Sequence, residues 1–246
     1  MQFGSLNLGL ARGVSGVPAL PKIAGAIARW DFSASAGLTI RTDEDMQYIE
    51  SAADLSGNGN AISESVAESQ ALWVPNARNA LGAMRHDGMG NGLRRAAFDS
   101  DPIAQPILIL SVLKFPTDGR CFLTCDDNSL TARRFVLGKH SSDVRIAQIV
   151  GGQSDIPALA DLAGIWVWRI DIINSTAKKI IMAAGEANMT PVAGSLYGVS
   201  IGANGSNFIM DPSDAEIGEI SIWQHDPSAG EIDALKNYAK HRWGLA

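Results

Sequence analysis

The acidic side chains are the residues of this 246-residue chain best suited to chemistry, and glycoside hydrolysis is a reaction that pairs of carboxylates catalyse. That reaction needs two carboxyl groups about 5 to 9 Å apart on either side of the scissile bond. Glu216 and Glu219 lie in one β-prone run, but their odd spacing would point them to opposite faces of a regular strand. Asp43, Glu44 and Asp45 are typical of a solvent-exposed loop. The sequence therefore predicts no catalytic carboxylate pair and no enzymatic activity.

Carbohydrate binding is the second chemistry that the residues allow. It needs an exposed aromatic ring with hydrogen-bonding side chains nearby. Only 7% of the residues are aromatic, which is few for a dedicated lectin. The candidate sugar-binding residues are Trp73, Trp223, Asn204 and Asn207.

Composition favours a globular domain and excludes several classes of protein. Hydrophobic residues make up 46% of the chain and charged residues 19%, which is enough for a substantial core. The net charge is −6 and lysines and arginines cluster at most in pairs, so we expect no nucleic-acid partner. No apolar run reaches the length of a membrane span. The first residues also lack the basic and apolar pattern of a secretory signal.

Short β-prone runs separated by Gly, Asn and Asp clusters predict an all-β domain over residues 27–246. In residues 166–172, one set of alternate positions holds Trp166, Trp168, Ile170 and Ile172, and the other holds Val167, Arg169 and Asp171. This alternation predicts an antiparallel strand with one buried and one exposed face.

One α-helix is expected at the end of the chain, over residues 228–242. Ser228 and Glu231 have the spacing of a capping box, and an apolar stripe at helical spacing follows them. Gly244 then provides a stop signal.

Residues 1–26 differ from the rest of the chain because they are rich in Gly, Ala and Leu and lack acidic residues. Their glycines disfavour a stable helix, so we expect a flexible, extended N-terminal arm. Two interpretations stay open: an arm that becomes ordered against a neighbouring subunit, and a disordered tail.

Four segments, in order along the chain, resemble the laminin-G-like and concanavalin A-like lectin–glucanase domains of bacterial and phage proteins. They are Trp30-Asp31 with the turn Asp-Leu-Ser-Gly-Asn-Gly-Asn at 54–60, residues 84–93, residues 163–169, and residues 200–245 with their Trp-Gly-Leu ending. The resemblance implies a two-sheet antiparallel jelly-roll sandwich, concanavalin A-like, closed by the C-terminal helix.

Relatives of this kind often hold Ca²⁺ at the rim of the sandwich, through oxygen ligands that suit a hard cation. By this resemblance, the candidate Ca²⁺ ligands are Asp87, Asn91, Asp126, Asp127 and Asp211. Acidic residues in turns also serve as turn formers, so that alternative stays open. The carboxylate motif of the glucanases with this architecture is missing.

The resemblance and the N-terminal arm together favour a non-enzymatic bacteriophage virion structural protein, from a tail, fibre, spike or head decoration. In this hypothesis residues 1–26 attach the domain to other virion proteins, in a homo-oligomer or multi-copy assembly. The jelly-roll surface would mediate adhesion to host glycans or decorate a particle assembled in the host cytoplasm. The alternatives are a secreted or surface carbohydrate-binding module, located outside a bacterial cell, and a divergent glycoside hydrolase.

Overall fold

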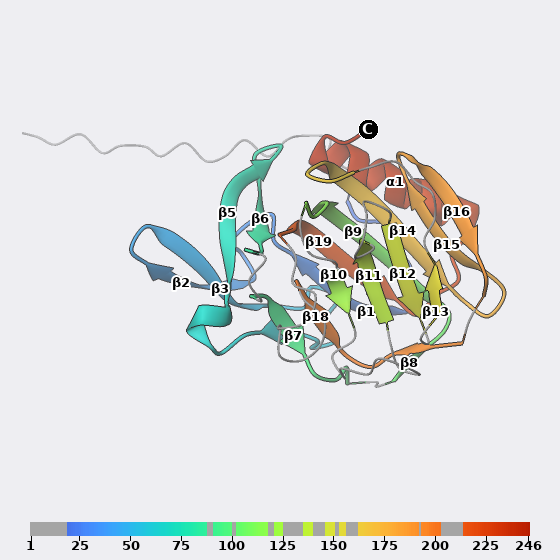
Figure 1. The fold of residues 1–246 in the computed structure, drawn as a ribbon, viewed down its shortest axis with the longest axis horizontal. Helices are drawn as coiled ribbons and strands as arrows, with labels where there is room; N and C mark the ends of the chain where they lie inside the picture. The colour runs from blue at the N-terminus through green and yellow to red at the C-terminus, as the bar shows by residue number, and fades with distance from the viewer. Residues whose placement is uncertain are drawn as a thin grey trace, which may run out of the picture.

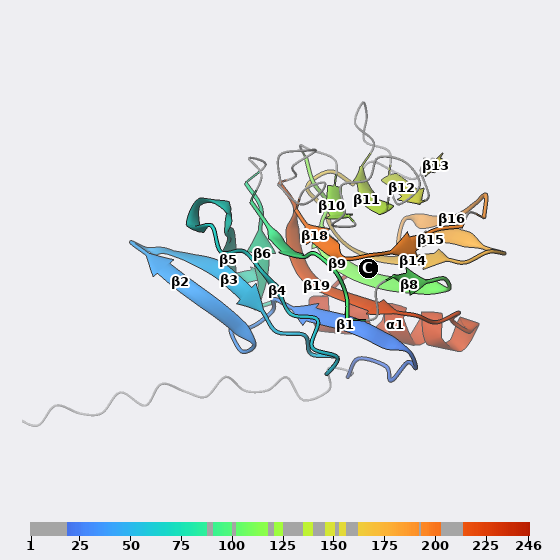
Figure 2. The same cartoon turned by 90° about the horizontal axis from the view of Figure 1, so that it is seen from below.

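The computed structural model describes residues 19–87, 91–99, 102–117, 121–124, 135–139, 146–150, 153–155, 162–191, 193–202 and 214–246. The strands lie in two layers, and α1 covers the outer face of one of them (Figures 1 and 2). All pairings between named strands are antiparallel. The predicted all-β antiparallel architecture is therefore confirmed.

The layer next to the helix, called the helix-side layer, has the strand order β16-β15-β14-β9-β19-β1. Its strands are β16 (Gly185–Met189), β15 (Lys178–Met182), β14 (Trp166–Ile173), β9 (Ile107–Lys114), β19 (Glu216–Trp223) and β1 (Ala26–Asp31).

The opposite layer has the strand order β13-β12-β11-β10-β18-β7-β4-β3-β2. Its strands are β13 (Gln153–Asp155), β12 (Ile146–Val150), β11 (Phe135–Lys139), β10 (Cys121–Thr124), β18 (Val199–Ile201), β7 (Leu93–Arg95), β4 (Ile62–Ser63), β3 (Met46–Ala52) and β2 (Leu38–Asp43).

Two further strands join the layers into one large sheet. β5 (Ala71–Arg78) pairs with β3, and β6 (Leu81–Arg85) pairs with both β5 and β19. A 3-10 turn, η1 (Ala67–Ser69), precedes β5. A separate small sheet pairs β8 (Ile103–Ala104) with β17 (Ser195–Leu196).

The helix α1 (Ala229–Trp243) forms where the sequence predicts it. The Ser228 side chain accepts a hydrogen bond from the Glu231 amide, and the Glu231 carboxylate accepts one from the Ser228 amide. At the other end Gly244 adopts a left-handed conformation with φ of 61°, which costs glycine little. No helix in the described ranges has the length and apolar character needed to cross a membrane.

Hydrophobic residues form two cores, one between the strand layers and one between the helix-side layer and α1. Trp30 and Ile220 belong to the first core, and Trp168, Trp223 and Trp243 to the second. Strands of the helix-side layer are therefore buried on both faces.

The predicted half-exposed face of β14 is wrong for this reason. Arg169 and Asp171 are fully buried beneath the opposite layer, with 0% exposure each. The Arg169 guanidinium donates two hydrogen bonds to the Asp171 carboxylate, at 2.8 and 2.7 Å, and another to the Gly138 carbonyl at 3.3 Å. A charged residue in an alternating pattern thus faces the interior because its neighbour two positions along neutralises it.

The predicted opposite orientation of Glu216 and Glu219 is also wrong. A β-bulge at Gly218 shifts the register, so Glu216 pairs with Lys114 and Glu219 with Val112 of β9. Residues two positions apart share a face, so both glutamates point to the helix side. The bulge leaves Gly218 against the Trp243 ring, where an added Cβ would lie 2.2 to 2.6 Å from ring carbons.

Residues that precede the first strand, β1, already pack against the domain. Ile23 is 8% exposed and belongs to the core beneath α1, and Leu20 packs against that core. The described end of residues 1–26 therefore contacts the domain.

Candidate functional site

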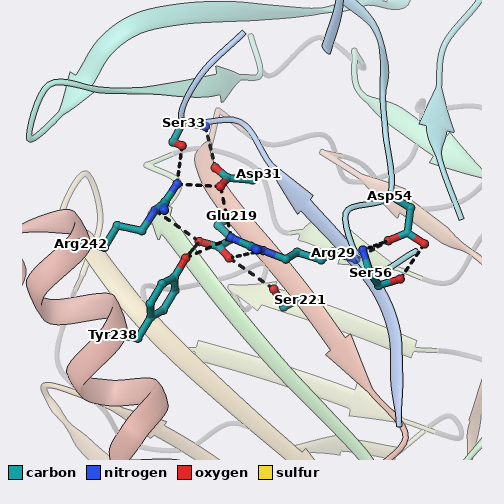
Figure 3. Close-up of polar contacts among 9 residues, drawn as sticks. All are labelled: Arg29, Asp31, Ser33, Asp54, Ser56, Glu219, Ser221, Tyr238 and Arg242. Carbon is teal, nitrogen blue, oxygen red and sulfur yellow. Dashed lines mark hydrogen bonds and ion pairs between the residues drawn. The ribbon is translucent and has the colours of Figure 1, made fainter. Parts of the chain in front are cut away.

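The most highly charged cluster in the described structure lies between α1 and strands β1 and β19 (Figure 3). Glu219 is at its centre and is fully buried. It accepts hydrogen bonds from Arg29 Nε at 3.0 Å and from the Tyr238 hydroxyl at 2.6 Å. Arg242 Nη2 lies 2.7 Å from Asp31 Oδ2, and Arg29 Nη2 lies 3.4 Å from the same oxygen. The two guanidinium groups thus connect the two carboxylates.

Burial sets the protonation equilibria in this cluster. It raises the pKa of Glu219, to which the charge of Asp31 adds, while Arg29, the Tyr238 hydrogen bond and Arg242 act against the rise. Burial and the Glu219 charge likewise raise the pKa of the Tyr238 hydroxyl above its usual range. A raised carboxyl pKa often marks a catalytic acid, but the helix closes this cluster to a substrate. Its residues instead hold α1 against the strands.

Glu216 and Glu219 do not form a usable catalytic pair although they share a face. Glu216 is ion-paired with Arg85 and Lys114 at 3.1 Å each. Trp243 packs against Gly218 between them. A sugar could not reach both carboxylates without displacing α1.

An open groove where β2, β3 and η1 approach residues 87 and 91 has the features of a ligand site. Its cavity has a volume of about 300 Å³. We call it the tyrosine groove; it is lined by Arg41, Asp43, Tyr48, Ala67, Glu68, Gln70, Leu72, Asp87 and Asn91. Most of these side chains are polar, so the groove offers many hydrogen-bonding groups around one aromatic ring.

Arg41 is the most firmly positioned side chain of the tyrosine groove. Its Nε donates to Gln70 Oε1 at 3.0 Å, its Nη1 to Asp43 Oδ2 at 3.0 Å, and its Nη2 to the Ala67 carbonyl at 3.3 Å. The guanidinium carbon lies 4.5 Å from the centre of the Tyr48 ring. Gln70 is itself buried and fixed by a hydrogen bond to the Glu64 carbonyl. The guanidinium is therefore preorganised before any ligand arrives.

Three carboxylates border the groove, and their surroundings differ. The Asp43 side chain is 61% exposed and paired with Arg41. Glu68 makes no hydrogen bond or ion pair with the described residues, and the Asp87 amide donates to Asn91 Oδ1 at 3.1 Å. The groove therefore combines Asp43, which is paired with the Arg41 cation, with Glu68, which has no cationic partner among the described residues.

His86 lies directly behind the groove and is 2% exposed. Its Nδ1 is 3.0 Å from the Asn91 carbonyl, an acceptor, so Nδ1 carries the proton and donates. Within the described structure, its Nε2 is buried without a hydrogen-bond partner. Burial lowers the pKa of His86 to about 4. The imidazole is therefore neutral near pH 7.

The structure separates the sugar-binding residues predicted from the sequence. Trp223 is 3% exposed because α1 covers its side of β19, and Trp73 is partly buried with its indole N–H donating to the Phe32 carbonyl. Asn204 and Asn207 lie outside the described residues.

Of the predicted calcium ligands, Asp87 and Asn91 come together at the tyrosine groove. Asn91 Oδ1 there accepts the Asp87 amide and so caps the turn. Asp126, Asp127 and Asp211 lie outside the described residues. Within the described ranges, no three His, Cys, Asp or Glu side chains gather as a metal site would require.

The sequence interpretation missed Arg41, Tyr48, Glu68 and Gln70. Arg41 and Tyr48 face each other across the hairpin of β2 and β3. The available signal was the alternation of Leu38-Thr-Ile-Arg-Thr before the acidic cluster at 43–45. We interpreted that cluster as a solvent-exposed loop; its residues are exposed, and they form the turn end of the hairpin of β2 and β3.

No family model and no curated protein matches the chain. Solved structures do share its fold. A GH54 α-L-arabinofuranosidase soaked with a cyclic sulfate inhibitor aligns with a TM-score of 0.63 and 10% identity, over 90% of this chain and 64% of that one. Domain 4 of AbnA, a GH43 extracellular arabinanase from Geobacillus stearothermophilus in complex with arabinotriose, aligns with a TM-score of 0.56 and 12% identity, over 86% and 98%.

A Trypanosoma rangeli sialidase in complex with sialic acid aligns with a TM-score of 0.57 and 11% identity, over 93% of this chain and 35% of that one. This chain spans about 60% of the length of the arabinofuranosidases. At these identities the likeness defines the fold: an all-β architecture that carbohydrate-active proteins use.

These neighbours overturn two predictions. The expectation of a non-enzymatic phage virion structural protein is wrong, because the similar structures are glycoside hydrolases and a domain of one. The expectation that the chain is not an enzyme is contradicted by the same finding. The virion prediction rested on the family resemblance and the N-terminal arm, and fold alone does not set function. The non-enzyme prediction rested on a missing carboxylate motif, which describes one arrangement of a glycosidase site and leaves others open.

Proposed function

We propose that this chain is a carbohydrate-active domain that binds an oligosaccharide in the tyrosine groove. One observation carries the proposal: a preorganised arginine, an aromatic ring and three carboxylates border a single open cavity of about 300 Å³. That volume is at the lower end of small-ligand sites, so it suits one sugar unit of a longer chain. We further propose that the two strand layers form the jelly roll of the laminin-G-like domains that the turn motifs resemble.

The chemistry of the groove complements a sugar. Vicinal hydroxyls can donate to the Asp43, Glu68 and Asp87 carboxylates and accept from the Arg41 guanidinium. Arg41 stacks against the Tyr48 ring, which keeps the ring in place for the apolar face of a sugar. Arabinose-containing oligosaccharides are the first ligands to test, because one similar structure holds arabinotriose. This proposal is compatible with the predicted alternative location outside a bacterial cell.

Calorimetric titration with arabinotriose, and with a glucose trisaccharide for comparison, tests the proposal. We expect saturable binding that Tyr48→Ala and Asp43→Asn each weaken by about tenfold, because each removes a direct sugar contact. Asp45→Asn is the matched control, since Asp45 lies in the same hairpin turn but does not line the cavity. Binding that Tyr48→Ala and Asp43→Asn leave intact would place the sugar elsewhere and contradict the proposal.

Hydrolysis in the same groove is the second candidate function. Retaining and inverting glycosidases need two carboxyl groups in different roles. Asp43, paired with Arg41, suits the role of the ionised nucleophile or base. Glu68 faces the same cavity without a cationic partner in the described structure, and suits the role of the acid.

Release of reducing sugar from arabinan separates hydrolysis from binding. If the groove is catalytic, we expect Glu68→Gln to lower kcat by about 10²- to 10⁴-fold while arabinotriose still binds. Turnover that Glu68→Gln leaves unchanged would exclude this assignment, and binding without turnover would leave the chain a binding domain.

A further inference from the structure

A second open cavity, of about 420 Å³, lies beside β4 and β7. We call it the arginine groove; it is lined by Ala61, Ser63, Glu64, Ser65, Arg94, Arg95 and Ala96. Its exposed polar groups are two guanidiniums and two hydroxyls. The acidic member of this set, Glu64, is 5% exposed, and its Oε1 accepts the Val66 amide. The arginine groove is thus rich in donors, whereas the tyrosine groove is rich in acceptors.

Both guanidiniums are anchored from within the protein. Arg95 Nη2 donates to Asp99 Oδ1, and Arg95 Nη1 to the Ala61 carbonyl at 3.4 Å. Arg94 Nε lies 3.8 Å from Glu64 Oε2, and the Arg94 side chain is 41% exposed. A guanidinium has five N–H donors, so a group that is anchored through some of them can still donate to a ligand. Planar guanidinium groups bind carboxylates in a bidentate manner.

One stretch of chain forms a wall of both grooves. Residues 63–65 line the arginine groove, and Ala67, Glu68 and Gln70 line the tyrosine groove. Ser65 and Ala67 are two residues apart, so their Cα atoms are within about 8 Å. Val66 lies between them and is 51% exposed. A chain-like ligand could therefore pass from one groove to the other over an exposed apolar side chain.

We propose that the arginine groove binds the carboxylate of an acidic sugar, a uronate, in the same glycan whose neutral unit occupies the tyrosine groove. This inference rests on the proposed function, because the tyrosine groove supplies the neutral contact. It adds a specificity: the chain prefers acidic glycans to neutral ones of equal length.

Oligogalacturonates and their fully methyl-esterified forms provide a matched pair of probes. The ester retains the sugar ring and the chain length and removes the negative charge. We expect the acid form to bind at least about tenfold more tightly than the ester, since each charged hydrogen bond contributes strongly. Arg94→Gln should abolish this preference by weakening the acid form alone. Arg94→Lys should retain part of it, because the charge remains without the bidentate geometry.

The titrations with the acid, the ester and arabinotriose distinguish the failure of one groove proposal from the failure of both. Equal binding of acid and ester would overturn the acidic-sugar proposal and leave the tyrosine-groove proposal standing. Binding of neither, together with no binding of arabinotriose, would overturn both. Competition by inorganic phosphate as effective as that by the oligogalacturonate would overturn the glycan assignment, since the groove would then be a general anion site. Thermal unfolding of the arginine variants shows whether a loss of binding reflects a loss of fold; if Arg94→Gln unfolds, Arg94→Lys replaces it, with the partial loss of preference given above.

Discussion

Arg41 and Arg169 show how the surroundings of a single residue decide whether its charge serves a ligand. Both are held by an aspartate two positions along the chain, at 3.0 Å for Asp43 and 2.7 Å for Asp171. Arg169 is sealed between the strand layers with 0% exposure, whereas Arg41 retains 27% of its side-chain surface. The same Arg-x-Asp spacing therefore forms a buried ion pair in β14 and a partly exposed ion pair in β2, at the tyrosine groove.

His86 gives the domain a pH dependence at the residue scale. Its folded pKa of about 4 is lower than its unfolded value of about 6.5, so below pH 6.5 the unfolded chain binds more protons. The contribution to the free energy of unfolding is complete above pH 6.5 and is lost as the pH falls towards 4. The loss amounts to at most about 3 kcal/mol. Urea denaturation at several pH values from 4 to 8 measures it.

His86→Asn should flatten this dependence between pH 4 and 6.5, because the amide keeps a donor for the Asn91 carbonyl and does not titrate. His241→Asn is the control, since His241 is exposed on α1. An unchanged slope in His86→Asn would show that another group titrates there.

At the scale of elements, α1 is attached to the helix-side layer both by charged contacts and by aromatic packing. Tyr238 and Arg242 contact the strand charges, and Trp243 stacks on Trp166 with ring centres 5.7 Å apart. Arg78, at the end of β5, donates to the carbonyl of Gly244 at 2.8 Å. Contacts from several strands thus fix both the position and the end of the helix.

Glu219→Gln should destabilise the protein by about 3 to 5 kcal/mol, because it weakens the charged hydrogen bonds from Arg29 and Tyr238 and leaves Arg29 and Arg242 to share the charge of Asp31. Tyr238→Phe should cost less, about 1.5 to 3 kcal/mol, as it removes the short hydrogen bond to Glu219 and a longer one from Arg29. Chemical denaturation measures both. The exposed Glu186→Gln, which breaks a pair with Lys179, is the control and should cost at most about 1 kcal/mol. Equal effects of Glu219→Gln and Glu186→Gln would refute the role given to the buried cluster.

Gly218→Ala should destabilise the protein by about 1 to 3 kcal/mol, because its Cβ would overlap the fully buried Trp243 ring. The near-ultraviolet circular dichroism of the tryptophans should change with it. Gly230→Ala is the matched control, since nothing lies within 4 Å of its added Cβ. A stable Gly218→Ala protein with an unchanged spectrum would show that Trp243 can move without cost.

The sequence predicted some of these elements and not others, for physical reasons. Capping residues act locally, so Ser228, Glu231 and Gly244 predicted the helix and its ends. Alternation predicted strands but not what covers them, so the burial of Trp223 under α1 could not be read from β19 alone. Gly218 at the bulge packs against the ring of Trp243, which is distant from it in the sequence. The tyrosine groove likewise brings together three separate segments of the chain. Such long-range contacts leave no local pattern.

At the scale of the whole molecule, the helix is a third layer of a fold whose middle layer is buried on both sides. Truncation after residue 227 would expose the second core, including Leu110 and Trp168. We expect the truncated protein to lose cooperative unfolding and to aggregate, because so large an apolar face is unstable in water. Size-exclusion chromatography and thermal melts measure this, with Lys236→Ala in the full chain as the control. A monomeric truncated protein with a sharp melt would contradict the three-layer description.

The bulge at Gly218 also determines which changes of length strand β19 can accept. Removal of this one residue would restore strict alternation along the strand. Glu216 and Glu219 would then be two positions apart and would keep the face that they already share, because Gly218 is the extra residue of the bulge. A one-residue insertion elsewhere in β19, without a second bulge to absorb it, would instead turn one part of the strand over and bring charged side chains to the apolar core. A homologue of this chain should therefore tolerate the loss of Gly218 more readily than a change of length elsewhere in β19.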